Sequence, residues 1–202
     1  MENYYINNFD IIRGFLRYSN PDYFYFGQII QRRKENPDIE RNARIIKSYY
    51  IYSDEYLVDK MDEIIKLCDL FNARFYLNPN VRSLRTCTLE AISALLENVK
   101  SEQYTPLQKK IDSVCGSTKA PHALKYWILD IDDKSVKIDK LLEDIEKVQI
   151  KDFHFSLTLP TINGFHVIVK PFDVSRIELP DNVSIQKNNP TLIYYKNVLG
   201  RF

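Results

Sequence analysis

The chain has few of the residues that build disulfide-stapled or linker-rich proteins. Its 202 residues include only three cysteines and five glycines. The cysteines are odd in number and far apart, and no Cys-x-x-Cys occurs, which argues against a disulfide framework and favours a reducing compartment. No short repeat, low-complexity tract or Gly/Ser-rich linker interrupts the sequence. We therefore expect residues 1–202 to form a single compact domain.

Long apolar runs and a charge excess are also missing. No run approaches the ~20 apolar residues that span a membrane, and the sequence does not begin like a signal peptide. We expect no membrane partner and a cytoplasmic location, and the abundance of Ile, Asn, Lys and Tyr is typical of A/T-rich bacteria and their phages. Basic residues number 28 against 27 acidic ones. Any contact with a nucleic-acid backbone must therefore come from local basic patches. The candidates are Arg32-Arg33-Lys34, the series Arg41, Arg44 and Lys47, Arg74, and Arg82 with Arg85.

The most informative segment is the acidic run Trp127–Asp133. Side chains alternate along a strand, so Asp130 and Asp132 are expected on one face and Trp127, Leu129 and Ile131 on the other. Two neighbouring carboxylates repel each other unless a cation lies between them, and hard oxygen ligands favour Mg²⁺ or Mn²⁺. The alternative is a strand that ends in a solvated acidic turn.

A second segment, Leu157–Lys170, reads as a β-hairpin. Asn163-Gly164 between apolar, β-branched stretches predicts a two-residue type I′ turn. That register places Thr161 opposite His166, and it places His166, Ile168 and Lys170 on one face. A histidine and a lysine would then lie within reach of whatever the acidic strand holds.

These two segments resemble motifs of the archaeo-eukaryotic primase and primase-polymerase superfamily. Asp130 and Asp132 match its hydrophobic-Asp-x-Asp motif, and Gly164-Phe165-His166, preceded by Leu159-Pro160-Thr161, matches its small-x-His motif. The resemblance implies a metal-dependent nucleotidyltransferase that adds nucleotides on a DNA template. It implies Asp130 and Asp132 as catalytic ligands of Mg²⁺ or Mn²⁺.

The resemblance also implies partners and further site residues. His166 is expected to act in catalysis and to contact the phosphates of a nucleoside triphosphate, together with Lys170 and Thr161. DNA, single-stranded or primed, and a replicative helicase are the expected macromolecular partners. The chain departs from the family at the third motif, where Ser184 stands in place of an aspartate and only Asp173 or Asp181 lies nearby to replace it.

The remaining sequence predicts an α+β fold of primase-polymerase type. Residues 1–44 are expected to be helical, including a helix through residues 24–31. Residues 45–120 read as an αβ module: strand 45–52, a helix after Ser53, strand 74–77, a helix after Ser83 and a short helix over 106–114. Residues 121–202 read as strand, helix, hairpin and a final strand near 191–195. That order predicts an RNA-recognition-like split βαβ unit, on which the αβ module packs.

Two other functions remain open. Because Ser184 replaces an acid, the protein could be a catalytically inactive primase relative that binds nucleotide or nucleic acid. Alternatively, His154 and His166 could be the paired histidines of a 2H-type phosphodiesterase. In the predicted register these two histidines face opposite sides of the hairpin, and Ile168 stands where a hydroxyl residue is expected.

Overall fold

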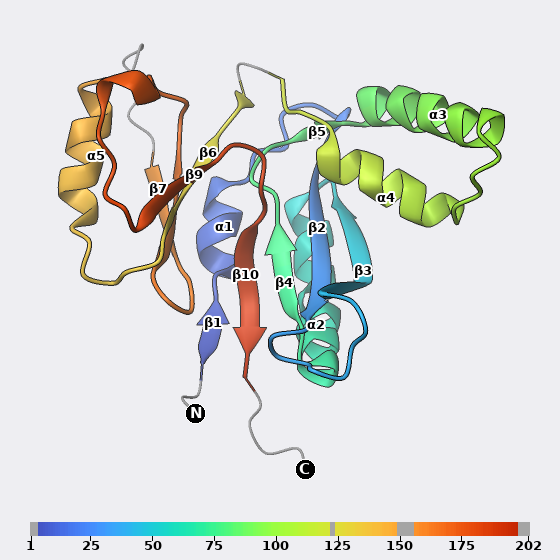
Figure 1. The fold of residues 1–202 in the computed structure, drawn as a ribbon, viewed down its shortest axis with the longest axis horizontal. Helices are drawn as coiled ribbons and strands as arrows, with labels where there is room; N and C mark the ends of the chain where they lie inside the picture. The colour runs from blue at the N-terminus through green and yellow to red at the C-terminus, as the bar shows by residue number, and fades with distance from the viewer. Residues whose placement is uncertain (1–3, 122–123, 149–155, 198–202) are drawn as a thin grey trace.

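The computed structural model describes residues 4–121, 124–148 and 156–197, and these residues form an α+β fold with two antiparallel sheets and five α-helices (Figure 1). The first sheet has the spatial order β1 (Tyr5–Asn7), β10 (Thr191–Lys196), β4 (Arg74–Leu77), β2 (Tyr23–Arg32) and β3 (Ala43–Ile51), and β5 (Arg82–Ser83) also pairs with β2. The second sheet has the order β7 (Ser156–Pro160), β8 (Phe165–Val169), β6 (Trp127–Ile131) and β9 (Val183–Gln186). The helices are α1 (Phe9–Phe15), α2 (Asp54–Phe71), α3 (Leu84–Lys100), α4 (Leu107–Ser117) and α5 (Ile138–Glu146), followed by a 3₁₀ turn η2 (Val174–Arg176). Among the described residues, no helix combines the length and apolar character needed to cross a membrane.

The two long helices begin where serine caps predict. Ser53 accepts a hydrogen bond from the backbone N–H of Tyr56, and Ser83 accepts one from that of Thr86. Helix α2 then buries Leu57, Ile64 and Cys68. These side chains join the main hydrophobic core, which α1 and the strands of the first sheet also line. Sequence periodicity therefore placed α2, β3 and β4 correctly.

The prediction of a helical segment over residues 1–44 is wrong. Among the described residues 4–44, only Phe9–Phe15 is α-helical, and residues 23–32 form the long strand β2. Strand β2 pairs with β3 on one side and with β4 on the other, and Phe24, Tyr25 and Phe26 are all buried. A central strand that is apolar on both faces has no alternation, so its sequence cannot be told from a helix by period alone.

The second sheet contains the predicted split βαβ unit. Strand β6, helix α5 and strand β7 follow one another along the chain, and β8 lies between β6 and β7 in the sheet. Leu141 and Ile145 of α5 pack against Leu129 and Ile131 of β6 in one hydrophobic cluster. The opposite face of this sheet packs toward the first sheet, because Ile128 belongs to the main core.

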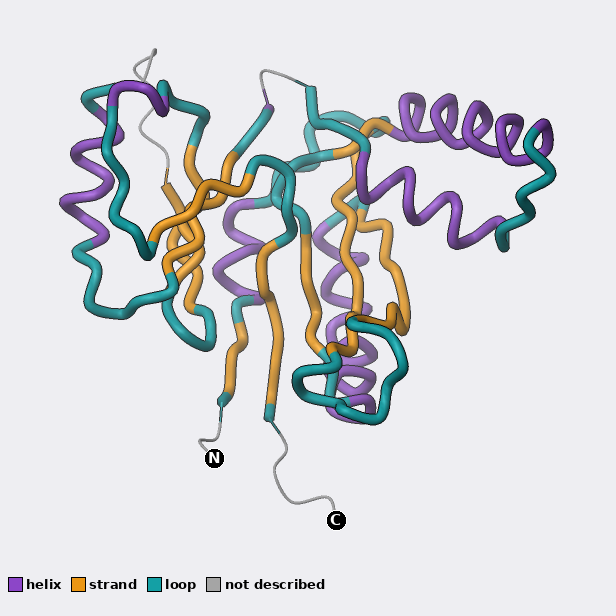
Figure 2. The backbone as a smooth tube through the Cα atoms, in the orientation of Figure 1, coloured by secondary structure: helices purple, strands orange, loops and turns teal. Residues whose placement is uncertain are grey.

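The last strand departs from the predicted module boundary. Strand β10 lies in the first sheet, between β1 and β4, and not beside the hairpin of the second sheet. Residues 121–202 therefore contribute to both sheets. The chain crosses between them after β9, and this crossing brings the two sheets against each other, as the trace in Figure 2 shows.

Arg82 was a candidate for a basic patch, but it is fully buried. Its guanidinium donates to the backbone carbonyls of Asn80 and Cys115 at 3.0 and 2.9 Å and to Oδ1 of Asn188 at 3.0 Å. Burial lowers the pKa of Arg82 to about 10. The residue joins β5, α4 and the loop before β10, so its role is structural.

Candidate active site

Asp130 and His166 lie directly opposite each other on the neighbouring strands β6 and β8. Nε2 of His166 is 3.1 Å from Oδ1 of Asp130, and Nε2 of Gln186 donates to Oδ2 of Asp130 at 2.6 Å. The hydrogen bond with His166 lowers the pKa of Asp130 and outweighs the effect of burial. A further hydrogen bond of 2.9 Å joins Nδ1 of His166 to Oγ1 of the fully buried Thr191. Both ring nitrogens are therefore held, which fixes the orientation of the ring.

Asp130 and Asp132 face the same side of the second sheet, as the alternation predicts. Both line a cavity of about 840 Å³ between the two sheets. Asp132 is exposed and follows the last residue of β6, whereas Asp130 is half-buried. The lining residues are Tyr4, Arg32, Lys34, Glu35, Arg74, Tyr76, Asp130, Asp132, Thr161, Ile162, Asn163, His166, Gln186, Asn189, Pro190, Leu192, Tyr195 and Asn197. The acidic pair and the histidine thus share one cavity.

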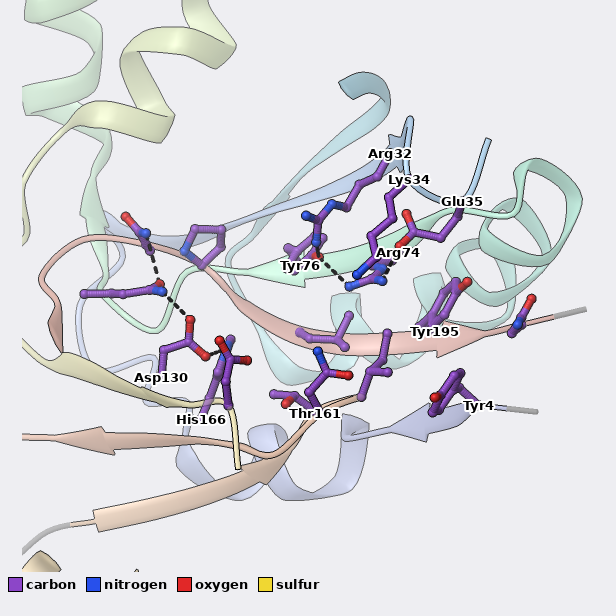
Figure 3. Close-up of a pocket in the computed structure, with 18 residues that line it drawn as sticks. Tyr4, Arg32, Lys34, Glu35, Arg74, Tyr76, Asp130, Thr161, His166 and Tyr195 are labelled. Carbon is purple, nitrogen blue, oxygen red and sulfur yellow. Dashed lines mark hydrogen bonds and ion pairs between the residues drawn. The ribbon is translucent and has the colours of Figure 1, made fainter. Parts of the chain in front are cut away.

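The opposite wall of the cavity is basic and aromatic. Figure 3 shows Asp130 and His166 on one side, with Arg32, Lys34 and Arg74 reaching in from the other. Arg74 forms an ion pair of 2.5 Å with Glu35.

Aromatic rings accompany these cations. The guanidinium of Arg74 lies 4.7 Å from the ring centre of Tyr195, and the hydroxyl of Tyr76 accepts hydrogen bonds from Arg32 and Arg74 at 3.4 and 3.3 Å. Three cations against one carboxylate make this wall attractive to an anionic ligand.

The hairpin differs from its prediction in register. Pro160 pairs with Phe165 and Leu159 with His166, so the loop consists of residues 161–164 and not of a two-residue turn. Thr161 closes this loop, because its Oγ1 accepts from Gly164 N at 3.1 Å and its N–H donates to the Gly164 carbonyl at 2.9 Å. The register shift equals two residues. A shift of two keeps each side chain on its predicted face, and both Thr161 and His166 line the cavity.

Gly164 is required by close approach and not by turn geometry. A Cβ atom at this position would lie 1.9 Å from the carbonyl oxygen of Ile131. The backbone of the hairpin loop at Gly164 is therefore in direct contact with the backbone at the end of β6. The small residue of the predicted small-x-His motif allows this contact, which brings the loop beside Asp132.

Ser184, which stands where the resemblance leads us to expect a third acid, is on strand β9 and does not line the cavity. Ser184 pairs directly with Asp130 across β6 and β9, and it is exposed. Neither alternative acid lines the cavity. Asp173 caps η2, where its Oδ1 accepts from the backbone N–H and hydroxyl of Ser175. Asp181 is exposed and lies ahead of β9.

Lys170, a predicted nucleotide-binding residue, does not line the cavity. Lys170 follows β8 at the end remote from Asp130, and its Nζ lies 3.9 Å from the ring centre of Tyr126. Burial lowers the pKa of this lysine. His154, the second histidine of the phosphodiesterase hypothesis, lies outside the described residues.

The two cavity carboxylates, Asp130 and Asp132, fit a hard divalent cation whose other ligands are water or phosphate oxygens. Mg²⁺ in phosphate chemistry is typically held by one or two carboxylates, while water and substrate phosphates fill the other positions. Asp130 and Asp132 provide two such carboxylates in one cavity. Within the part of the chain that the structure describes, no group of three or more His, Cys, Asp and Glu forms a complete metal cage.

Sequence reasoning missed Gln186, Tyr76 and Thr191 as site residues, whereas Arg74 was already a candidate for a basic patch. Gln186 stands two positions after Ser184 on the same strand face, so alternation along β9 could have identified it. Alternation along β4, with Phe75 and Leu77 buried, likewise turns Arg74 and Tyr76 away from the core and toward the cavity. Thr191 carries no such signal, because its contact with His166 depends on the packing of one sheet against the other.

Comparison with known proteins found no match for this chain among protein-family models, curated proteins or solved structures.

Proposed function

We propose that this protein is a metal-dependent nucleotidyltransferase of the DNA primase and primase-polymerase type, which binds a nucleoside triphosphate in the cavity between its two sheets. The observation that carries the proposal is the arrangement of charge in that cavity. Asp130, Asp132 and His166 occupy one wall, and Arg32, Lys34 and Arg74 occupy the other. An anionic ligand with a bound cation complements both walls.

The residues divide the work of phosphoryl transfer. Asp130 and Asp132 would hold Mg²⁺ or Mn²⁺, which supplies charge neutralisation at the transferring phosphate. The ring nitrogens of His166 are engaged by Asp130 and Thr191, so Nε2–H would donate to a phosphate oxygen only after Asp130 turns from His166 to the cation. Arg32 and Lys34 are exposed on the facing wall and attract the triphosphate. Catalysis then consists mainly of positioning and electrostatic stabilisation, and no protein nucleophile is needed.

DNA is the proposed second ligand. The hairpin that joins β2 to β3 carries the exposed residues Arg33, Lys34, Arg41 and Arg44, and its Arg32, Lys34 and Glu35 line the cavity. A basic hairpin beside the cavity suits the phosphates of a template strand. A replicative helicase is retained as a proposed partner on the resemblance alone.

The test is a primer-extension assay combined with calorimetric titration of Mn²⁺ and of a nucleoside triphosphate. We expect the double variant Asp130→Asn/Asp132→Asn to lose Mn²⁺ binding and extension. The matched control is Asp181→Asn, which removes an exposed carboxylate outside the cavity. Unchanged Mn²⁺ affinity in the double variant would remove the basis of the metal assignment.

A second function is favoured by Ser184. This hydroxyl faces Asp130 where the family resemblance leads us to expect a third carboxylate. The protein could therefore bind nucleotide without transferring it. Tight binding of nucleoside triphosphate without any extension product, for every template and primer offered, would support this inactive relative over the enzyme.

A further inference from the structure

Helices α3 and α4 form an arm that projects from the body of the molecule (Figures 1 and 2). One face of α3 is turned inward, where Cys87 and Ala91 are buried. Cys87 shares a hydrophobic cluster with Cys115 of α4 and with Phe24 and Phe26 of β2. The inner face therefore anchors the arm to the first sheet, and the outer face is left without a partner in the monomer.

The outer face of α3 carries four large apolar side chains. Leu89, Ile92, Leu96 and Val99 are 60, 52, 56 and 60% exposed. Their spacing of three, four and three residues places them on a narrow stripe at 100° per residue. This is the a/d pattern of a coiled-coil seam. A surface stripe of this kind indicates a helical partner.

The stripe is symmetric along the chain. Ile92 and Leu96 lie two residues to either side of Ala94, and Leu89 and Val99 lie five residues to either side. In an antiparallel pair of α3 helices related by a two-fold axis near Ala94, Leu89 of one copy meets Val99 of the other. Ile92 likewise meets Leu96. A self-complementary patch is the requirement for an isologous dimer.

Polar and charged residues agree with the antiparallel arrangement. Thr88 and Ser93 flank the stripe with small uncharged side chains, which allow a second helix to approach closely. Arg85 is exposed at the first turn of α3, and Glu102 is exposed just beyond its last turn. The antiparallel pairing brings Arg85 beside Glu102 of the second copy. A parallel pairing would instead place Arg85 beside Arg85.

The tip of the arm adds apolar surface. Tyr104 is 79% exposed and Leu107 is 65% exposed, at the turn between α3 and α4. In the antiparallel arrangement this tip reaches the start of the partner's α3. Because α4 already holds α3 in place, dimer formation does not require helix ordering.

We propose that α3 forms an antiparallel homodimer with a second copy of this chain, through a seam of Leu89, Ile92, Leu96 and Val99. The two α3 helices would then lie against each other, with the α4 helix of each copy on the far side of its own α3. The inference does not depend on the nucleotide chemistry proposed for the cavity.

Sedimentation velocity over a range of protein concentrations tests the proposal on the full chain. We expect wild type to shift from monomer to dimer, and Leu96→Glu to weaken the dimer by at least about tenfold, because each dimer loses two seam side chains. The matched control is Leu70→Glu, which changes a 64% exposed leucine on α2. Leu96→Gln removes the same apolar side chain without adding a charge and should also weaken the dimer. A circular dichroism melt of each variant shows whether the monomer is still folded.

Disulfide trapping tests the direction of the helices. Leu89→Cys and Val99→Cys variants, mixed and oxidised, should form a mixed disulfide dimer, whereas Leu89→Cys alone should not. The native cysteines among the described residues are buried and should contribute little. A wild type that stays monomeric at all concentrations overturns the proposal. So does a dimer that survives Leu96→Glu, and so does efficient crosslinking of Leu89→Cys to itself.

Discussion

Replacing Ser184 by aspartate tests the geometry of the acidic site directly. Ser184 on β9 pairs with Asp130 on β6, so a carboxylate at position 184 would stand across the strand from an existing one. Directly opposed residues in an antiparallel pair have Cβ atoms about 4.5–5.5 Å apart. The substitution adds little volume, and Ser184 is exposed, so packing should be preserved. The effect of Ser184→Asp should therefore be electrostatic.

The expected cost follows from Coulomb's law. Two charges about 5 Å apart repel by roughly 1 kcal/mol in water and roughly 3 kcal/mol at an effective dielectric constant near 20. The side chain of Asp130 is 23% exposed, and Gln186 and His166 already stabilise its charge. We therefore expect a loss of unfolding free energy of about 1–2 kcal/mol in the absence of divalent cations. For a domain of this size that corresponds to a fall in Tm of roughly 2–8 °C.

Thermal unfolding followed by circular dichroism measures the loss of stability in chelator and its recovery in excess MnCl₂. A cation held by Asp130 and the new carboxylate should reverse the loss, so Mn²⁺ should raise the Tm of Ser184→Asp more than that of wild type. Ser184→Asn is the matched control, because it has the same shape without the charge. Equal Tm values for the two variants in chelator, together with equal responses to Mn²⁺, would refute the proposed position of Ser184 beside a metal-binding carboxylate.

Four further predictions address the same site and its support. The pKa of Asp130 is lowered in the folded protein, so its ionised carboxylate contributes stability that is present above the unfolded pKa of aspartate, near 3.9, and is lost as pH falls through the folded pKa. The difference in unfolding free energy between wild type and Asp130→Asn should therefore shrink in acid. His166→Ala should weaken binding of nucleoside triphosphate about tenfold or more by calorimetry while leaving single-stranded DNA affinity unchanged, since a charge-assisted hydrogen bond contributes about 1.5–3 kcal/mol. Gly164→Ala should lower the Tm and the Mn²⁺ affinity together, because its Cβ would meet the Ile131 carbonyl; an unaltered melt would contradict the close approach. Arg82→Met should lower the free energy of unfolding, measured in urea, by on the order of 3–5 kcal/mol, because it leaves several buried carbonyls without a hydrogen-bond donor. The exposed control Arg176→Met should change it by no more than about 0.5 kcal/mol.

Local signals predicted much of this fold correctly. Ser53 and Ser83 mark helix starts because a hydroxyl side chain satisfies backbone N–H groups that the first turn leaves free. Strand alternation placed Asp130 and Asp132 on the face opposite the core residue Leu129. These inferences depend only on residues within a few positions of one another, and that is why they held.

Long-range pairing could not be predicted in the same way. The sequence of β2 predicts a helix because both faces of this strand are covered, so that its apolar residues show no period-2 alternation. Strand β10 follows β9 closely in sequence but pairs in the other sheet, where β1 and β4 accept it. The basic wall of the cavity arises from this arrangement, since Arg74 lies on β4 beside β10.

Strand alternation determines the face on which His166 lies, and the packing of the two sheets determines the orientation of its ring. The predicted hairpin register was wrong by two residues, but a shift of two preserves the face of every side chain, so Leu159 still shares a face with His166. The pairing of β6 with β8 separately places His166 opposite Asp130. Alternation along the strand does not determine the orientation of the imidazole ring, however. Its Nδ1 is held by Thr191 of β10, which belongs to the opposite sheet. The orientation of the His166 ring therefore depends on the contact between the two sheets, and a substitution that displaces β10 should change that orientation without touching β6 or β8.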